Sequence, residues 1–83
     1  MVTPQQIKDW IEAGLPDSSV VIDGDGHHFE ALIVSDAFDG LNQIKRHQMV
    51  YQALGDKMKS EIHALSMQTR TPAEADRQVP TDG

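Results

Sequence analysis

Two short runs rich in β-branched residues, separated by a loop of aspartate and glycine, constrain most strongly how this chain can fold. The runs lie at residues 20–22 and 29–34, and Asp23-Gly24-Asp25-Gly26-His27-His28 separates them. Aspartate and glycine favour turns because they adopt the backbone angles that tight reversals need. The pattern therefore predicts an antiparallel hairpin with a rather long loop.

Helical patterns flank this hairpin on both sides. Upstream, Thr3, Pro4 and Gln6 form a capping signature, and apolar residues follow at helical spacing. That first face comprises Ile7, Trp10, Ile11 and Leu15. Downstream, a second helical stripe precedes Gly55, and a short further helix is expected through Met58. The second stripe comprises Leu41, Ile44, His47, Val50, Tyr51 and Leu54.

Residues 62–69 read as a third strand. Because a helical crossover leads into it, we expect it to lie parallel to the strand at 29–34. The fold class is then α+β, with the order α-β-β-α-α-β and helices on one face of a three-stranded mixed sheet. Thr71 and Pro72 predict one more short helix, so we expect a single domain over residues 1–78 and a disordered tail at 79–83.

Composition narrows the chemistry that such a domain can perform. The 83 residues include no cysteine, which excludes disulfides, thiolate metal sites and thiol nucleophiles. No apolar stretch approaches the roughly 20 residues that span a bilayer, and no leader pattern precedes the first helix. With 7 Lys+Arg against 13 Asp+Glu, the net charge of −6 repels nucleic acids and acidic membranes. We expect a cytoplasmic protein, monomeric or weakly dimeric when alone.

The four histidines are the main candidates for chemistry. His47 shares the inward stripe of the second helical pattern, which indicates a partly buried core histidine hydrogen-bonded within the fold. His63 lies near the start of the third strand, at an edge of the sheet, where it can be exposed enough to bind a metal. A purely structural role is the alternative, because single histidines in strands are usually structural. His27 and His28 occupy the hairpin loop.

The basic residues concentrate in the region of the second helical pattern. They are Lys45, Arg46, Lys57 and Lys59. This group is a candidate docking surface for an acidic partner or for DNA, although a solvated face explains it equally well. No Gly-x-x-Gly loop joins the helices and no aromatic platform is available for stacking bases, which weakens the DNA interpretation.

Enzymatic and calcium-binding roles find little support. The sequence contains no nucleophile–base arrangement, no phosphate-binding glycine loop and no carboxylate pair in a recognisable cleft, so we expect no enzyme. The Asp-Gly repeat that begins at Asp23 fails as a calcium loop. Its twelfth position holds Val34, where a bidentate glutamate is required.

Three separated motifs carry a family resemblance. Phe38-Asp39-Gly40, then Lys45-Arg46-His47-Gln48-Met49-Val50-Tyr51, then Ile62-His63-Ala64-Leu65 follow one another at close, fixed distances. This combination resembles the BolA family, and the resemblance extends from Ile7 to Glu74. It implies a fold similar to a class II KH domain.

The resemblance also implies a function. BolA-like proteins pair with a monothiol glutaredoxin and glutathione around a shared [2Fe–2S] cluster, and the histidine of the Ile-His-Ala-Leu motif, here His63, is the implied iron ligand. The second ligand is implied to come from the loop between the first two strands, which offers His27 and His28. Pleat alternation favours His28 if Phe29 points into the core, while His27 lies in the turn and could swing either way.

Such a mixed site has a definite chemistry. Replacing thiolate by neutral imidazole reduces the negative charge of the cluster and raises its potential. Imidazole must be deprotonated to bind, so acidification below its reference pKa of about 6.5 should weaken the complex. BolA relatives have also been regarded as transcription regulators, and DNA binding through the basic region is the alternative function.

Overall fold

The first helix, α1 (Pro4–Gly14), begins where the capping signature predicts it. In the computed structural model, which describes residues 2–77, the Thr3 hydroxyl accepts a hydrogen bond from the Gln6 amide at 3.2 Å. The Gln6 side chain in turn accepts one from the Thr3 amide at 2.9 Å. These bonds satisfy two amides that the helix start would otherwise leave without partners.

The sheet has the order β1-β2-β3, with β1 (Ser19–Gly24) antiparallel to β2 (His28–Val34) and β3 (Ala64–Arg70) parallel to β2. This confirms the predicted hairpin and parallel third strand. The strand bounds differ slightly from the predicted ones, because β3 begins two residues later. Ile62, predicted within that strand, lies buried just before it.

The connection from β2 to β3 contains a 3-10 turn, η1 (Asp36–Phe38), and then α2 (Gln43–Leu54) and α3 (Lys57–Ser60). Asn42 starts α2, because its side chain accepts a hydrogen bond from the Lys45 amide at 2.9 Å. Helix α4 (Pro72–Arg77) follows β3 as predicted.

The rotation of α2 differs from the prediction. Its buried residues are Arg46, Val50 and Leu54, whereas Ile44 is 70% exposed and Tyr51 is 42% exposed. Steps of four residues keep the buried set on one side of the helix, and Ile44 lies about 200° away from Arg46. The hydrogen bonds of Arg46 to the last residues of β3 and to α4, described below, hold the helix in this rotation.

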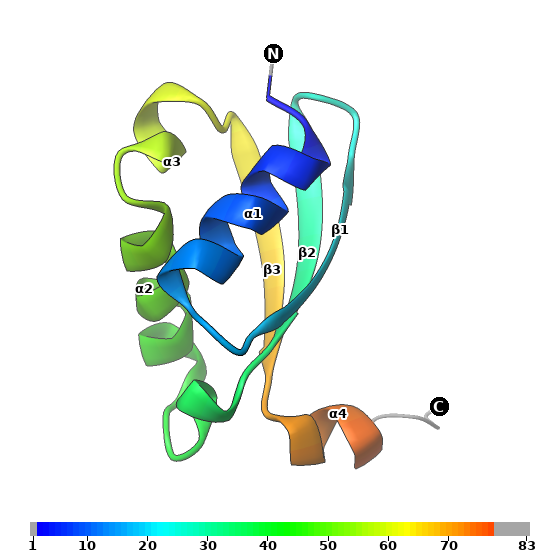
Figure 1. Cartoon of the computed structure of the whole chain (residues 1–83), viewed down its shortest axis with the longest axis vertical. Coiled ribbons are helices and arrows are strands. Elements are labelled where there is room, and N and C mark those ends of the chain that lie inside the picture. The colour runs from blue at the N-terminus through cyan, green and yellow to red at the C-terminus, as the bar shows by residue number, and fades with distance from the viewer. Residues whose placement is uncertain (1, 78–83) are drawn as a thin grey trace.

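Helices α1 and α2 pack against each other and cover one face of the sheet, and α3 continues beside α2 (Figure 1). The core lies between these layers and includes fully buried Phe29, Phe38, Ile7, Ile11, Ile33 and Val50. The predicted α+β class with a mixed three-stranded sheet is confirmed. Within residues 2–77, no helix is both long and apolar enough to cross a membrane. The tail predicted at 79–83 lies outside the described residues.

Candidate functional site: a histidine pair at one end of the sheet

Parallel pairing brings the starts of β2 and β3 to the same end of the sheet. The register places His28 opposite Ala64, so the residues that precede them, His27 and His63, are neighbours. The Ala64 amide donates a hydrogen bond to the His27 carbonyl at 3.1 Å and extends the pairing beyond β2. Two histidines far apart in the sequence therefore lie side by side.

The two imidazole rings contact each other. The ring centroids of His27 and His63 are 5.7 Å apart, and the ring planes are nearly perpendicular at 86°. Both residues are exposed. The pair is therefore accessible to a partner from outside the chain.

Asp25 holds the loop that presents His27. Its Oδ1 accepts hydrogen bonds from the backbone amides of His27 and His28, each at 2.9 Å, and Gly26 between them adopts φ +99°. The amides of His28 and His27 lower the pKa of the Asp25 carboxyl, because they stabilise its charged form. The sequence predicted a rather long loop here, and the structure shows that one carboxylate orders it.

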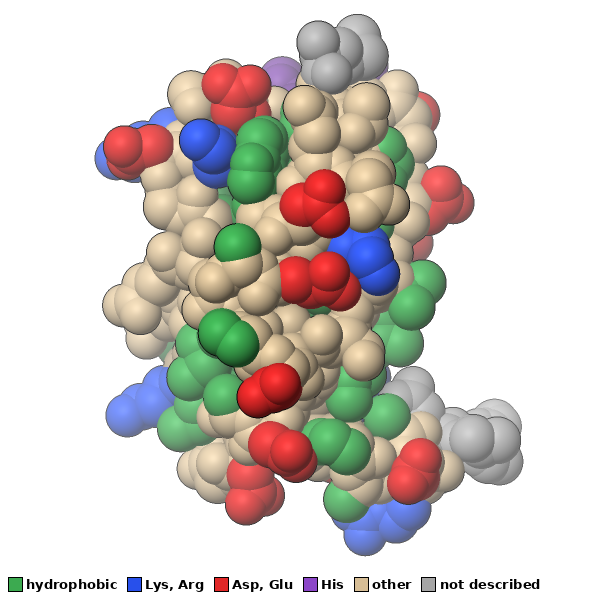
Figure 2. All heavy atoms as spheres, viewed as in Figure 1, with side chains coloured by type: hydrophobic (Ala, Val, Ile, Leu, Met, Phe, Trp, Pro, Cys, Tyr) green, Lys and Arg blue, Asp and Glu red, His purple; other side chains and the backbone are tan. Residues whose placement is uncertain are grey.

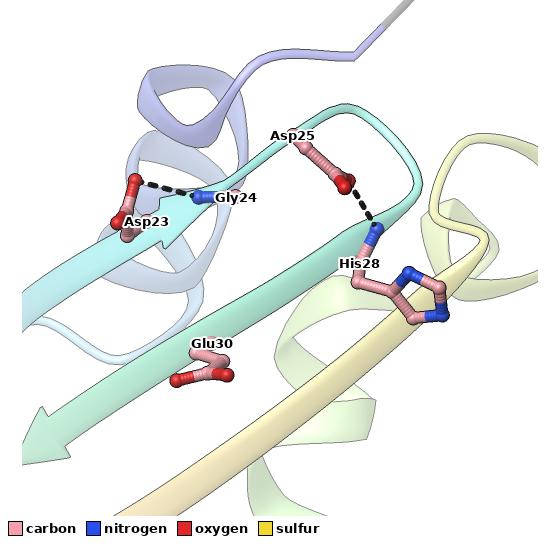
Figure 3. A pocket seen from close by; sticks show the side chains of 5 residues that line it. All are labelled: Asp23, Gly24, Asp25, His28 and Glu30. Carbon is pink, nitrogen blue, oxygen red and sulfur yellow. Dashed lines mark hydrogen bonds between the residues drawn. The ribbon is translucent and has the colours of Figure 1, made fainter.

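His28 takes a different position. It lines one recess with Asp23, Asp25 and Glu30 on the face of the sheet that carries no helix, and Figure 3 shows its ring extending towards β3, away from Asp23. Phe29 is buried on the opposite face, as pleat alternation requires. The ring contact to His63 belongs to His27, so the structure favours His27 over the preferred His28 as the neighbour of His63.

The geometry of the histidine pair can be compared with that of a metal site. Imidazole nitrogens bind metals at about 2.0–2.1 Å, so two rings on one tetrahedral ion have centroids roughly 5 Å apart. The observed 5.7 Å is close to that spacing. Among residues 2–77, however, no group of three or more histidine, cysteine, aspartate or glutamate side chains could hold a metal. The pair fits as a partial ligand set that needs donors from another molecule.

Arg46, predicted as a docking residue, is instead buried, with 5% of its surface exposed. Its Nε donates to the Leu41 carbonyl at 2.8 Å, and its guanidinium binds both carboxylate oxygens of Glu74, at 2.7 and 3.0 Å. A further bond runs to the Thr69 carbonyl at 3.3 Å, and the guanidinium lies 5.9 Å from the Phe38 ring centroid. The docking prediction for Arg46 is wrong, because its guanidinium is buried and bonded to groups within the fold.

The three lysines of the predicted docking group are exposed but do not form one patch. Lys45 lies in the first turn of α2, roughly 14 Å of helix before its last residue, and Lys57 comes only after α2 has ended. Lys57 lies over the Trp10 ring, 5.2 Å from its centroid. In Figure 2, Lys and Arg side chains occupy separate places among acidic ones. Lys59 lines a recess of about 150 Å³ together with Glu61 and His63.

His47 is half-buried on α2, as predicted. Its ring makes no hydrogen bond to the residues described between 2 and 77, so the predicted bonding within the core is absent there. The pairing of Arg46 with Glu74 was missed altogether. The cap signature from Thr71 to Glu74 was the available signal, because it placed a carboxylate at the start of α4.

Comparisons with known proteins agree with this description. A family model for BolA-like proteins matches residues 12–74. Acid stress protein IbaG of Escherichia coli strain K12 is 36% identical over 70 residues, which is 83% of each chain. SufE-like protein 1 of Arabidopsis thaliana is 53% identical over 47 residues, 57% of this chain but 13% of that protein. The chain also spans only 38% of BolA-like protein 1 from Bos taurus, to which it is 41% identical.

Solved structures share the fold. A BolA homologue from Coxiella burnetii is 52% identical with a TM-score of 0.88, over 93% of this chain and 100% of that one. Yeast Fra2 is 30% identical with a TM-score of 0.75, over 94% of this chain and 88% of that one. Because the family model covers most of the chain and these folds coincide with it, this chain belongs to the BolA family.

Proposed function

We propose that this chain is an adaptor that pairs with a monothiol glutaredoxin and contributes His63 and His27 as ligands of a shared [2Fe–2S] cluster, in cluster trafficking or iron sensing. The single observation that carries the proposal is the exposed ring pair at 5.7 Å. The chain has no cysteine, so thiolates would come from the glutaredoxin and from glutathione.

The surroundings of the pair support this role. Asp25 orders the loop before a ligand arrives, which lowers the entropy cost of binding. Lys59 shares the recess beside His63 and offers a cation to a carboxylate of the partner or of glutathione. His28, over the other face of the sheet, is a reserve donor rather than the preferred one.

The proposal also predicts acid sensitivity. A neutral imidazole nitrogen binds metal, whereas a protonated one cannot, so acidification weakens a histidine-ligated complex. The relative named acid stress protein IbaG makes a role under acid conditions a reasonable setting for such a response.

The decisive test mixes the chain with a monothiol glutaredoxin, glutathione, iron and sulfide, and records visible absorption and circular dichroism. We expect the wild type to change the glutaredoxin spectrum, and His63→Ala and His27→Ala to abolish that change. His28→Ala is the matched control and should behave as wild type.

Two results would contradict the proposal in different ways. If the wild type leaves the glutaredoxin spectrum and homodimeric state unchanged, the adaptor function is wrong. If His28→Ala removes the change while His27→Ala does not, the function stands but the loop ligand is His28.

A further inference from the structure

The sheet face opposite the helices has no helix or strand over it in the described part of the chain (Figure 1). Alternate strand residues point to this face, and the pairing register arranges them in rows across the strands. One row is Val21, Leu32 and Gln68, and the next is Asp23, Glu30 and Ser66.

The acidic row contains a like-charge pair. Asp23 and Glu30 are directly opposite each other on antiparallel strands, an arrangement that destabilises a sheet. Asp25 adds a third carboxylate at the rim of the same recess, of about 400 Å³, which His28 also lines (Figure 3). The recess is large enough for a lysine or arginine side chain.

No cation of the chain compensates this pair within residues 2–77. The ion pairs there join Lys8 to Glu12 at 3.3 Å and Arg46 to Glu74 at 2.7 Å, both away from the recess. Among the described residues, the Asp23 carboxylate accepts a hydrogen bond only from the neighbouring Gly24 amide, at 2.8 Å. The acidic row thus retains its charge for a partner.

The adjacent row is apolar on β1 and β2. Val21 is 70% exposed and faces half-buried Leu32 across the strand pair. One extended partner segment would therefore contact an exposed aliphatic side chain and the uncompensated charge pair together.

We propose that this outer sheet face docks a basic segment of a partner protein, with a lysine or arginine over Asp23 and Glu30 and an apolar side chain against Val21 and Leu32. The two rows are one two-residue step apart, roughly 7 Å, which matches residues i and i+2 of an extended peptide. Nucleic acids and acidic membranes are repelled by the same carboxylates. A second copy would add three more carboxylates to a chain whose net charge is −6.

The test uses the ¹⁵N-labelled full chain and a capped six-residue peptide of alternating arginine and leucine. We expect saturable shifts of the amide signals of β1 and β2 on the outer-face rows. The double variant Asp23→Asn, Glu30→Gln should weaken binding at least tenfold, and Val21→Thr several-fold. Asp76→Asn, which removes an exposed carboxylate from α4, is the matched control and should leave affinity unchanged.

A stability measurement separates a binding role from a structural one. Glu30→Gln relieves like-charge repulsion, so it should raise the thermal midpoint while it weakens peptide binding. A structural role for Glu30 would lower the midpoint instead.

Three results would overturn the proposal. They are an affinity that the double variant leaves unchanged, equal binding of a glutamate–leucine peptide, and a wild-type dimer in ultracentrifugation that Val21→Thr dissociates. The last would make a second copy the occupant. None of these measurements involves the histidine pair or a glutaredoxin, so this proposal and the adaptor function fail independently.

Discussion

The polar side chains at the two ends of strand β3 differ in burial: those at one end are bonded inside the fold, and those at the other end are exposed. At the end that leads into α4, Arg46 is buried and bonded to two backbone carbonyls and to both oxygens of Glu74. At the end where β3 begins, His27 and His63 are exposed and contact each other through ring edges.

This contrast separates stability from binding capacity. A buried donor whose partners are all internal rigidifies the fold, and it becomes costly when one partner is removed. Exposed imidazole rings contribute little to the stability of the fold, but their nitrogens remain available to bind a metal or a partner. Mutations at the two ends should therefore have opposite consequences for folding and for binding.

The largest effect is expected from Arg46→Met. The substitution keeps much of the side-chain volume but leaves the Leu41 carbonyl and the Glu74 carboxylate without the guanidinium that binds them. We therefore expect a loss of roughly 2–4 kcal/mol of unfolding free energy. Urea unfolding followed by far-ultraviolet circular dichroism measures it. Lys45→Met, one residue earlier and exposed, is the control and should change stability by less than about 0.5 kcal/mol. If Lys45→Met lowered the unfolding free energy as much as Arg46→Met, the buried bonds of Arg46 would not be what stabilises this end of β3.

A smaller effect is expected from Glu74, the partner of Arg46, whose contribution to the free energy of unfolding should depend on pH. Hydrogen bonding to Arg46 lowers the pKa of Glu74 to about 2, with the Thr71 amide adding to the effect. Because the pKa is lower in the folded chain, this stabilisation is fully present above the ordinary glutamate pKa of 4.5 and is lost as the pH falls towards 2. Urea midpoints of the wild type and of Glu74→Gln should therefore converge with acidification. A constant difference between them would show that the charge of Glu74 is not what stabilises α4.

The smallest effect is expected at the histidine end. His27→Ala and His63→Ala remove exposed rings, so each should change the unfolding free energy by less than about 0.5 kcal/mol. The same variants are expected to abolish the cluster complex, which makes this the sharpest form of the contrast. Thermal unfolding of both variants checks it, and a large loss of stability would assign the ring pair a structural role.

Much of the fold could be predicted because its signals are local. The capping residues of α1, the Asp-Gly loop and the crossover before β3 each depend on neighbouring residues or on general rules of connection. The rotation of α2 could not, since it depends on Glu74, 28 residues beyond Arg46, and on the Thr69 carbonyl. The sequence pattern around Arg46 does not distinguish a buried arginine from an exposed one.

The site shows the same division. His63 could be singled out from its motif, and the loop histidines from their position. The choice between His27 and His28 depends on two hydrogen bonds from Asp25 and on the strand register, neither of which is written in the residue pattern. Pleat alternation correctly placed His28 on the face opposite Phe29. The ring that contacts His63 belongs to His27, which precedes β2, so alternation along the strand does not predict its direction.

The parallel register of β2 and β3 has a consequence for folding. His27 and His63 lie on either side of the connection that contains α2 and α3, so their rings meet only after this long loop has closed. An unfolded chain offers the two imidazoles as separate monodentate donors. Any ligand that needs both therefore binds the native state selectively and shifts the folding equilibrium by mass action, so that occupancy of the site and integrity of the sheet are thermodynamically linked.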